Sequence, residues 1–129
     1  VALRRTVTVR RGRITDRLEC RSETEHTYDW AFHAPGRLSC SIPMEAAEGP
    51  LGSAAGYQHI TGVSRGRTDE AWTALWEQDG AKLTLRVEAA PGTDVFAGAA
   101  PGRKPSDRVP CLVIRRRARE TVFAVVHEF

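Results

Sequence analysis

Asparagine is absent from this 129-residue chain, and lysine occurs only at Lys82 and Lys104. Without asparagine there is no site for N-linked glycosylation, and one of the side chains best suited to binding a neutral carboxyl group is missing. Cysteine occurs only as Cys20, Cys40 and Cys111. They form no C-x-x-C pair, which excludes a zinc knuckle or a thioredoxin-like motif. Because their number is odd, at least one thiol stays unpaired within the chain, and the sequence assigns no disulfide.

Long hydrophobic runs are also missing. No apolar segment approaches the roughly 20 residues needed to cross a bilayer, so we expect no membrane contact. Hydrophobic residues make up 41% and charged residues 27%, which is typical of a globular domain. The only methionine is Met44, and no signal peptide opens the chain. We therefore expect residues 1–129 to be a single domain excised from a longer protein.

Arginine dominates the cations: of 19 basic side chains only two are lysine, so 17 are arginine, and the net charge is +3. A guanidinium group pairs well with carboxylate, sulfate or phosphate. The bias is explained equally well by a polyanionic partner or by coding bias. The arginines at 4–5, 10–13 and 115–117 are separated by mixed sequence, so we expect no nucleic-acid-binding tail and no nucleic-acid partner.

Apolar and polar residues alternate along most of the chain, which is the period of a β-strand. The segments WTALWEQ (72–78) and KLTLRVE (82–88) flank Asp79-Gly80, the strongest hairpin signal in the sequence. A second hairpin is expected between CLVIRRR (111–117) and TVFAVVHEF (121–129). Its turn would lie at Ala118 and Arg119.

Glycine and proline recur at intervals too short for long helices. We expect an all-β fold, a two-layer antiparallel β-sandwich of about 8–10 short strands. The segments PMEAAEG (43–49) and GAAPGRKPSDRVP (98–110) are expected to be surface loops, and GPLGSAAG (49–56) a mobile loop. The G-x-S-x-G match at 62–66 lacks the strand-turn-helix context of a hydrolase nucleophile and is interpreted as accidental.

The segment HTYDWAFHAPG (26–36) concentrates polar and aromatic residues. On a strand, side chains alternate between faces. One face would carry His26, Tyr28, Trp30 and Phe32, and the other Thr27, Asp29, Ala31 and His33. Zinc needs three or four converging ligands, and Asp29 and His33 are only two. We expect a strand with one aromatic and one polar face, and no metal.

The larger aromatic side chains allow two interpretations. Aromatic residues on a sheet face most often belong to the core. An exposed tryptophan would instead form a stacking platform for a sugar ring. We expect at least one of them to be exposed beside arginine and to cause weak self-association: Tyr28, Trp30, Tyr57, Trp72 or Trp76.

Five segments, taken in order, resemble the C-terminal part of heparinase II/III-like polysaccharide lyases, including relatives of oligoalginate lyases. They are HTYDWAFHAPG, GYQHITGVSRGRTDEAW, APGTDVFAG, RVPCLVIRRR and TVFAVVHEF, and they span most of the chain from about Arg5 to Glu128. These enzymes join an α/α toroid to an antiparallel β-sandwich and cleave uronate-containing polysaccharides by β-elimination. The resemblance therefore implies a β-sandwich here and a missing N-terminal toroid as its partner.

Elimination requires a group that neutralises the uronate carboxylate, a base that removes the C5 proton, and an acid that protonates the leaving oxygen. In the family the toroid supplies most of these groups, and the family's zinc-binding segment has no counterpart here. The resemblance implies no cofactor on this chain and no activity in isolation, with His33 the one catalytic candidate. It implies an extracellular or periplasmic location and substrate contacts from a strand and an R-G-R-T-D turn: His26, Tyr28, Asp29, Trp30, Arg65 and Arg67.

Two alternatives remain at this point. The chain could be a free-standing module that binds anionic carbohydrates through arginine and tryptophan. It could also be a structural domain without a ligand of its own, whose aromatic face packs against a partner.

Overall fold

The computed structural model describes residues 1–53 and 56–129. The GPLGSAAG loop expected at 49–56 therefore lies partly outside the described residues. Within them the one helical element is the short 3-10 helix η1 (Tyr57–His59). The strands are β1 (Ala2–Arg10), β2 (Arg13–His33), β3 (Arg37–Cys40), β4 (Glu45–Ala46), β5 (Thr61–Thr68), β6 (Trp72–Gln78), β7 (Ala81–Val87), β8 (Thr93–Pro101) and β9 (Arg108–Glu128).

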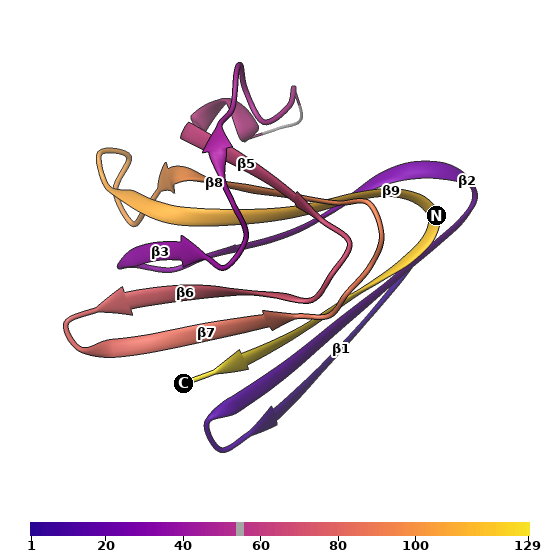
Figure 1. Ribbon diagram of the computed structural model, residues 1–129, viewed down its shortest axis with the longest axis horizontal. Helices are drawn as coiled ribbons and strands as arrows, with labels where there is room; N and C mark the ends of the chain where they lie inside the picture. The colour runs from indigo at the N-terminus through magenta and orange to yellow at the C-terminus, as the bar shows by residue number, and fades with distance from the viewer. Residues whose placement is uncertain (54–55) are drawn as a thin grey trace.

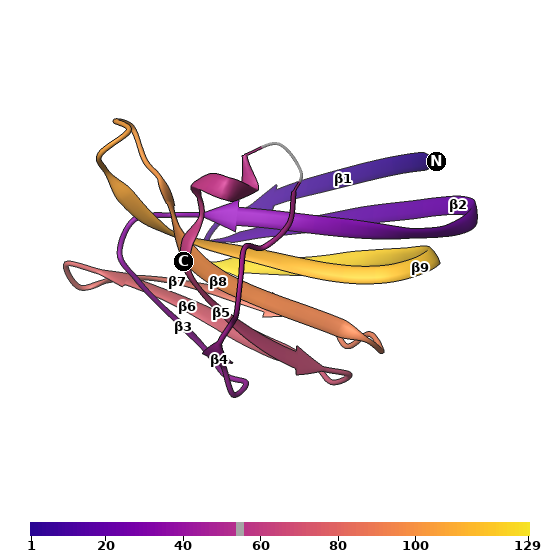
Figure 2. The same ribbon diagram turned by 90° about the horizontal axis from the view of Figure 1, so that it is seen from above.

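The nine strands form one antiparallel hydrogen-bonded sheet that curls into a half-barrel with two facing layers (Figures 1 and 2). The first layer has the order β3-β6-β7-β9-β2-β1, and the second has the order β2-β9-β8-β5-β4. Strands β2 and β9 run through both layers and join them where they bend. This confirms the expected all-β, two-layer antiparallel fold.

The hairpin expected at Ala118 and Arg119 is wrong, because residues 108–128 form the single strand β9. Both halves of β9 pair with β2: Glu128 to Glu120 face 13–21, and Ala118 to Cys111 face 26–33. The register shifts only between Arg21 and His26, where β2 bends. Neither Ala118 nor Arg119 is a residue type that favours the positive φ of a tight turn. Long-range pairing with β2 therefore keeps the chain extended.

The hairpin at Asp79-Gly80 is confirmed and joins β6 to β7. Both residues have positive φ, 50° and 83°, as a type I′ turn requires. Two loop expectations are partly wrong: β8 continues to Pro101 and β9 begins at Arg108, which shortens the 98–110 loop, and β4 lies within 43–49. The G-x-S-x-G match lies in the extended strand β5, so the expectation that it is accidental is consistent with the fold.

The main core lies between the two layers. Its buried hydrophobic members alternate along their strands as the sequence predicts: Cys20, Tyr28, Trp30, Trp72, Ala74, Trp76, Leu85, Val87, Val95, Leu112, Ile114, Phe123 and Val125. Phe32 of the second layer meets Trp76 of the first edge to face, with 5.3 Å between ring centroids. A smaller cluster on the outer face of the second layer contains Leu51, Ala100, Cys111 and Val113. The segment that connects β4 to β5 contributes Leu51 to this cluster, and Tyr57 and Ile60 of the same segment pack against it.

One carboxylate is buried in the core. Asp16 of β2 accepts two hydrogen bonds from Arg5 of β1, at 2.9 and 2.6 Å, and one from Trp30 Nε1 at 3.1 Å. Burial raises the pKa of Asp16, but the hydrogen bonds from Arg5 and Trp30 outweigh it, so the pKa lies below its usual value. This network links β1 and the first-layer part of β2 to Trp30 in the second-layer part of β2.

Among the described residues all three cysteines are free thiols. Burial raises the pKa of Cys40 to about 11, and it also raises the pKa values of Cys20 and Cys111. No helix in this part of the chain has the length and apolar character needed to span a membrane.

Candidate functional site

A row of alternating charges crosses the outer face of the second layer. Arg67 of β5 lies directly opposite Asp94 of β8, Asp94 opposite Arg115 of β9, and Arg115 opposite Asp29 of β2. We call these four residues the charge ladder. Opposite charges on directly facing strand positions attract one another, so the register of four neighbouring strands fixes the ladder.

Arg115 and Asp29 form the more enclosed end of the ladder. The guanidinium donates two parallel hydrogen bonds to the carboxylate, at 2.8 and 2.9 Å, and a third to the carbonyl of Leu51 at 2.9 Å. Both side chains are mostly buried, with 22% and 19% of their area exposed. The hydroxyl of Tyr57 also donates to Asp29. This arrangement fastens the β4–β5 connection to the sheet.

The environment of Tyr57 controls its proton. Burial, together with the hydrogen bond to the Asp29 carboxylate, raises the pKa of the phenol to about 12. The hydrogen bonds that Arg115 itself donates to Asp29 raise the pKa of Arg115. At neutral pH the Tyr57 phenol is therefore protonated and donates a hydrogen bond to Asp29, so it does not act as a base.

The other end of the ladder is open to solvent. Arg65 and Arg67 both reach the same oxygen of Asp94, at 3.0 and 3.4 Å, and expose 52% and 64% of their side-chain area. The Asp94 carboxylate thus pairs with two guanidinium groups at once. Each guanidinium has five N–H donors, so most of them remain directed away from Asp94. The ring of Phe96 lies 5.7 Å from the Arg65 guanidinium.

A hollow of about 480 Å³ adjoins this open end. Arg65, Arg115 and Phe96 line one side, and Glu45 of β4 and Glu48 of the β4–β5 connection line the other side. Glu45 lies directly opposite Arg65 in the register of β4 and β5. The hollow thus has cationic groups on one side and acidic groups on the other.

The structure brings together three of the residues selected from the sequence: Asp29, Arg65 and Arg67 all belong to this face. Tyr28 and Trp30 lie on the opposite face of β2 and are buried, 8% and 3% exposed. The Tyr28 hydroxyl donates to the carbonyl of Arg119. A sugar ring has no access to either aromatic face in this conformation.

The two histidines lie apart from the ladder. His26 is exposed at the bend of β2, with its Nε2 3.2 Å from Thr24 Oγ1. His33 is exposed and shares the outer face with Asp29, opposite Cys111. Four residues of strand separate it from Asp29, about 13 Å, so the two side chains do not form a pair.

The expectation of an exposed large aromatic is wrong. Trp72 and Trp76 are 4% and 2% exposed, Tyr28 and Trp30 are buried, and Tyr57 is half-buried. The exposed apolar side chains lie instead at the chain ends and on β1, at Val1, Leu3, Val7, Val9 and Phe129. The alternation of residues along each strand predicted which face of the sheet each tryptophan occupies. Whether that tryptophan is exposed depends on how far the facing layer of the sheet extends over it.

Sequence reasoning did not identify Arg115, Tyr57, Asp94 or Phe96 as site residues. Arg115 belongs to a run of three arginines that the structure separates: Arg115 binds Asp29, whereas Arg116 on the other face is buried and donates to Thr93 Oγ1 at 2.9 Å. The available signal in the sequence was that successive side chains of a strand point to opposite faces, which separates Arg115 from Arg116. In residues 1–53 and 56–129, no group of three or more His, Cys, Asp and Glu side chains is arranged to hold a metal ion.

No protein-family model matches this chain, and no curated protein matches it.

Proposed function

We propose that this chain is the β-sandwich domain of a polysaccharide lyase that cleaves uronate-containing polysaccharides by β-elimination, and that its contribution is to hold substrate. One observation carries the proposal: two exposed guanidinium groups, Arg65 and Arg67, share a single carboxylate oxygen of Asp94. A uronate carboxylate is the complementary partner for their remaining donors.

The surroundings of this arginine pair suit a sugar acid. Asp94 fixes both guanidiniums on a rigid sheet, which lowers the entropic cost of ordering them when substrate binds. Phe96 supplies an apolar surface beside Arg65, and the adjoining hollow of about 480 Å³ gives room for further sugar units. Neutralising the carboxylate acidifies the C5 proton, which is the first requirement of elimination.

Proton transfer itself falls to groups outside this chain. Tyr57, the one tyrosine beside the ladder, has a pKa of about 12 and donates its proton to Asp29. A base with so high a pKa is almost fully protonated at neutral pH. We assign the proton-transferring groups to an N-terminal toroid domain, and the chain alone is expected to be inactive.

A binding measurement with matched variants tests this role. Isothermal titration with saturated oligouronates should give binding that falls roughly ten-fold or more in Arg65→Gln and in Arg67→Gln, since each change removes a charge-assisted hydrogen bond. Arg86→Gln is the control, because Arg86 is similarly exposed at 58% and pairs with Glu128 on the other layer. Equal affinities in all three variants would contradict the proposal.

Activity is measured separately. β-Elimination produces a conjugated double bond that absorbs in the near ultraviolet. Incubation of the chain with alginate, heparan sulfate or hyaluronan should give no such absorbance. A rise that His33→Ala abolishes would show that this chain carries catalytic groups of its own.

A free-standing module that binds anionic carbohydrate is the second candidate. It is favoured by the position of Arg65, Arg67 and Phe96 on one face of one chain, so binding needs no other domain. The two candidates predict the same titration. They differ in whether the source gene encodes a helical toroid upstream.

A further inference from the structure

Strand β1 forms an edge of the first layer and is open along its full length. It pairs with β2 over all nine residues from Ala2 to Arg10, and among the described residues no strand pairs with its other side. The other edge of the first layer is β3, which is only four residues long, and one edge of the second layer is β4, which is only two residues long. The second edge of that layer is the part of β2 at residues 26–33, which pairs with β9 alone in the part of the chain that the structure describes. Short edge strands resist association, whereas a long open one offers a row of free N–H and C=O groups.

Proline and β-bulges, two of the features that blunt an edge strand, are missing from β1, and its charged residues are the three arginines Arg4, Arg5 and Arg10. Its face toward the core side carries Leu3, Val7 and Val9, which are 63%, 52% and 64% exposed. The fourth residue of that face, Arg5, is neutralised by two hydrogen bonds to Asp16. A strand with one unpaired side and an uncovered apolar face is suited to pairing with another strand.

We propose that β1 pairs with β1 of a second copy of this chain, antiparallel, about a two-fold axis that passes through Thr6. The proposal concerns assembly and does not depend on the function of the charge ladder. The two first layers then become one continuous sheet, with β1 strands at its centre.

Charge selects this register. A two-fold axis perpendicular to the sheet leaves the core-side residues of both copies on the same face. Directly opposite residues then share a face, so the axis must lie midway between a residue and its own copy. An axis at Arg5 places Arg5 opposite itself, and an axis at Val7 places Arg4 opposite Arg10. Like charges directly opposite destabilise a sheet. Only the axis at Thr6 pairs all nine residues without setting arginine against arginine.

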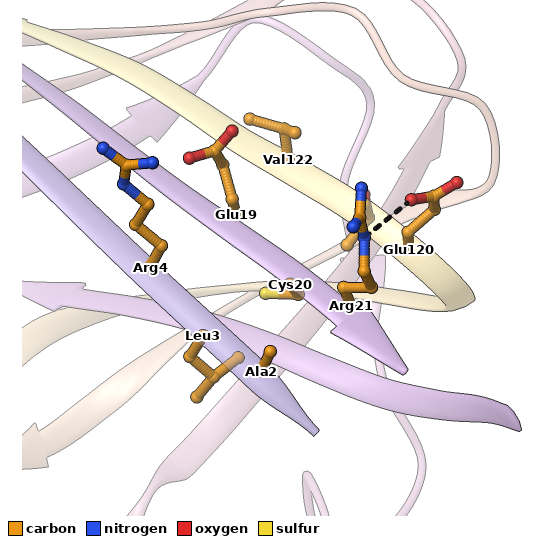
Figure 3. Close-up of a pocket in the computed structure, with 9 residues that line it drawn as sticks. Ala2, Leu3, Arg4, Glu19, Cys20, Arg21, Glu120 and Val122 are labelled. Carbon is orange, nitrogen blue, oxygen red and sulfur yellow. Dashed lines mark ion pairs between the residues drawn. The ribbon is translucent and has the colours of Figure 1, made fainter. Parts of the chain in front are cut away.

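The pairs made by this register are complementary. On the core-side face, Leu3 meets Val9 of the second copy, and Val7 covers the aliphatic stem of Arg5. On the other face, Thr6 meets Thr6, a favourable cross-strand pair, and the small Ala2 leaves room for the long Arg10. A hollow of about 460 Å³ lies beside Ala2 and Arg4, and Figure 3 shows Arg4 and Leu3 pointing away from opposite faces of β1.

Cross-linking tests the axis directly. In Thr6→Cys the two new thiols face each other, so mild oxidation or the shortest bis-thiol reagent should link most of the chain into dimers. In Thr8→Cys the two thiols lie four residues apart along the strands, about 14 Å, and should not be linked. The unchanged chain is the second control, because Cys20 and Cys111 are buried and Cys40 is half-buried.

Sedimentation of two variants with opposite charges at position 8 measures the stability of the dimer independently of cross-linking. Thr8 faces Arg4 of the second copy, so Thr8→Glu should strengthen the dimer and Thr8→Lys should weaken it. Two symmetry-related pairs should change the dissociation constant by about 2- to 30-fold in each direction. Circular dichroism checks that each variant keeps its strands.

The outcomes separate cleanly. Dimers with efficient linkage only at position 6 and opposite effects of glutamate and lysine support the proposal. A monomer at all concentrations, linkage at position 8 in place of position 6, or equal effects of both charges overturns it.

Discussion

Arg115 of β9 donates two parallel hydrogen bonds, of 2.8 and 2.9 Å, to Asp29 of β2, although 86 positions separate the two residues in the chain. The pair is possible because β2 and β9 run side by side in one register. It connects the sheet to the β4–β5 connection through the Leu51 carbonyl and the Tyr57 hydroxyl. The carboxylate is thereby fully engaged in a structural role.

Asp29→Asn should lower the free energy of unfolding by about 1–3 kcal/mol, because a mostly buried guanidinium loses its counter-charge. Urea unfolding followed by tryptophan fluorescence measures the effect. Glu120→Gln is the control: its pair with Arg21 is 70% and 80% exposed, and we expect a change below about 0.5 kcal/mol. If the two substitutions lower the free energy of unfolding equally, the pair of Arg115 and Asp29 contributes no more to stability than an exposed ion pair.

Tyr57 should ionise only at very alkaline pH. Its pKa of about 12 lies above the ordinary value because of burial and the Asp29 carboxylate. Since the folded pKa is raised, the stability contributed by this phenol is present below about pH 10 and lost as pH rises toward 12. Titration of phenolate absorbance should show a late step that Tyr57→Phe removes. Disappearance of an earlier step instead would contradict the enclosed hydrogen bond.

The alternation of side chains along strands and the residue preferences of tight turns predicted much of the fold from the sequence. They gave the faces of 26–33 and the hairpin at Asp79-Gly80 because both depend on local geometry. They failed at Ala118 and Arg119, where pairing of β9 with β2 decides the conformation. For the same reason the sequence singled out Asp29 but not its partner Arg115, whose position opposite Asp29 follows from strand register.

His127 should make stability depend on pH near neutrality. The ring is buried, 7% exposed, and lies 5.1 Å from the Phe32 ring. Burial lowers its pKa, while Asp16 opposes and Arg5 adds to this shift. The unfolded chain then binds more protons, so stability is complete above about pH 6.5 and falls as pH drops through that value toward the folded pKa.

His127→Gln should flatten this part of the profile. Unfolding free energies of both proteins at several pH values between about 7.5 and 5 provide the measurement. The unchanged chain should lose more stability over this range than the variant. Asp16 also titrates, but its lowered pKa places its contribution at more acidic pH. Parallel profiles would show that His127 is not responsible.

The binding role of Arg65 and Arg67 is tested most directly by nuclear magnetic resonance of the isotope-labelled chain during titration with saturated oligouronates. The account predicts that the largest shifts fall on the guanidinium Nε resonances of these two arginines and on the backbone amides of Asp94 and Phe96. Shifts confined to β1 and β2, or no shifts with any oligouronate, would contradict it.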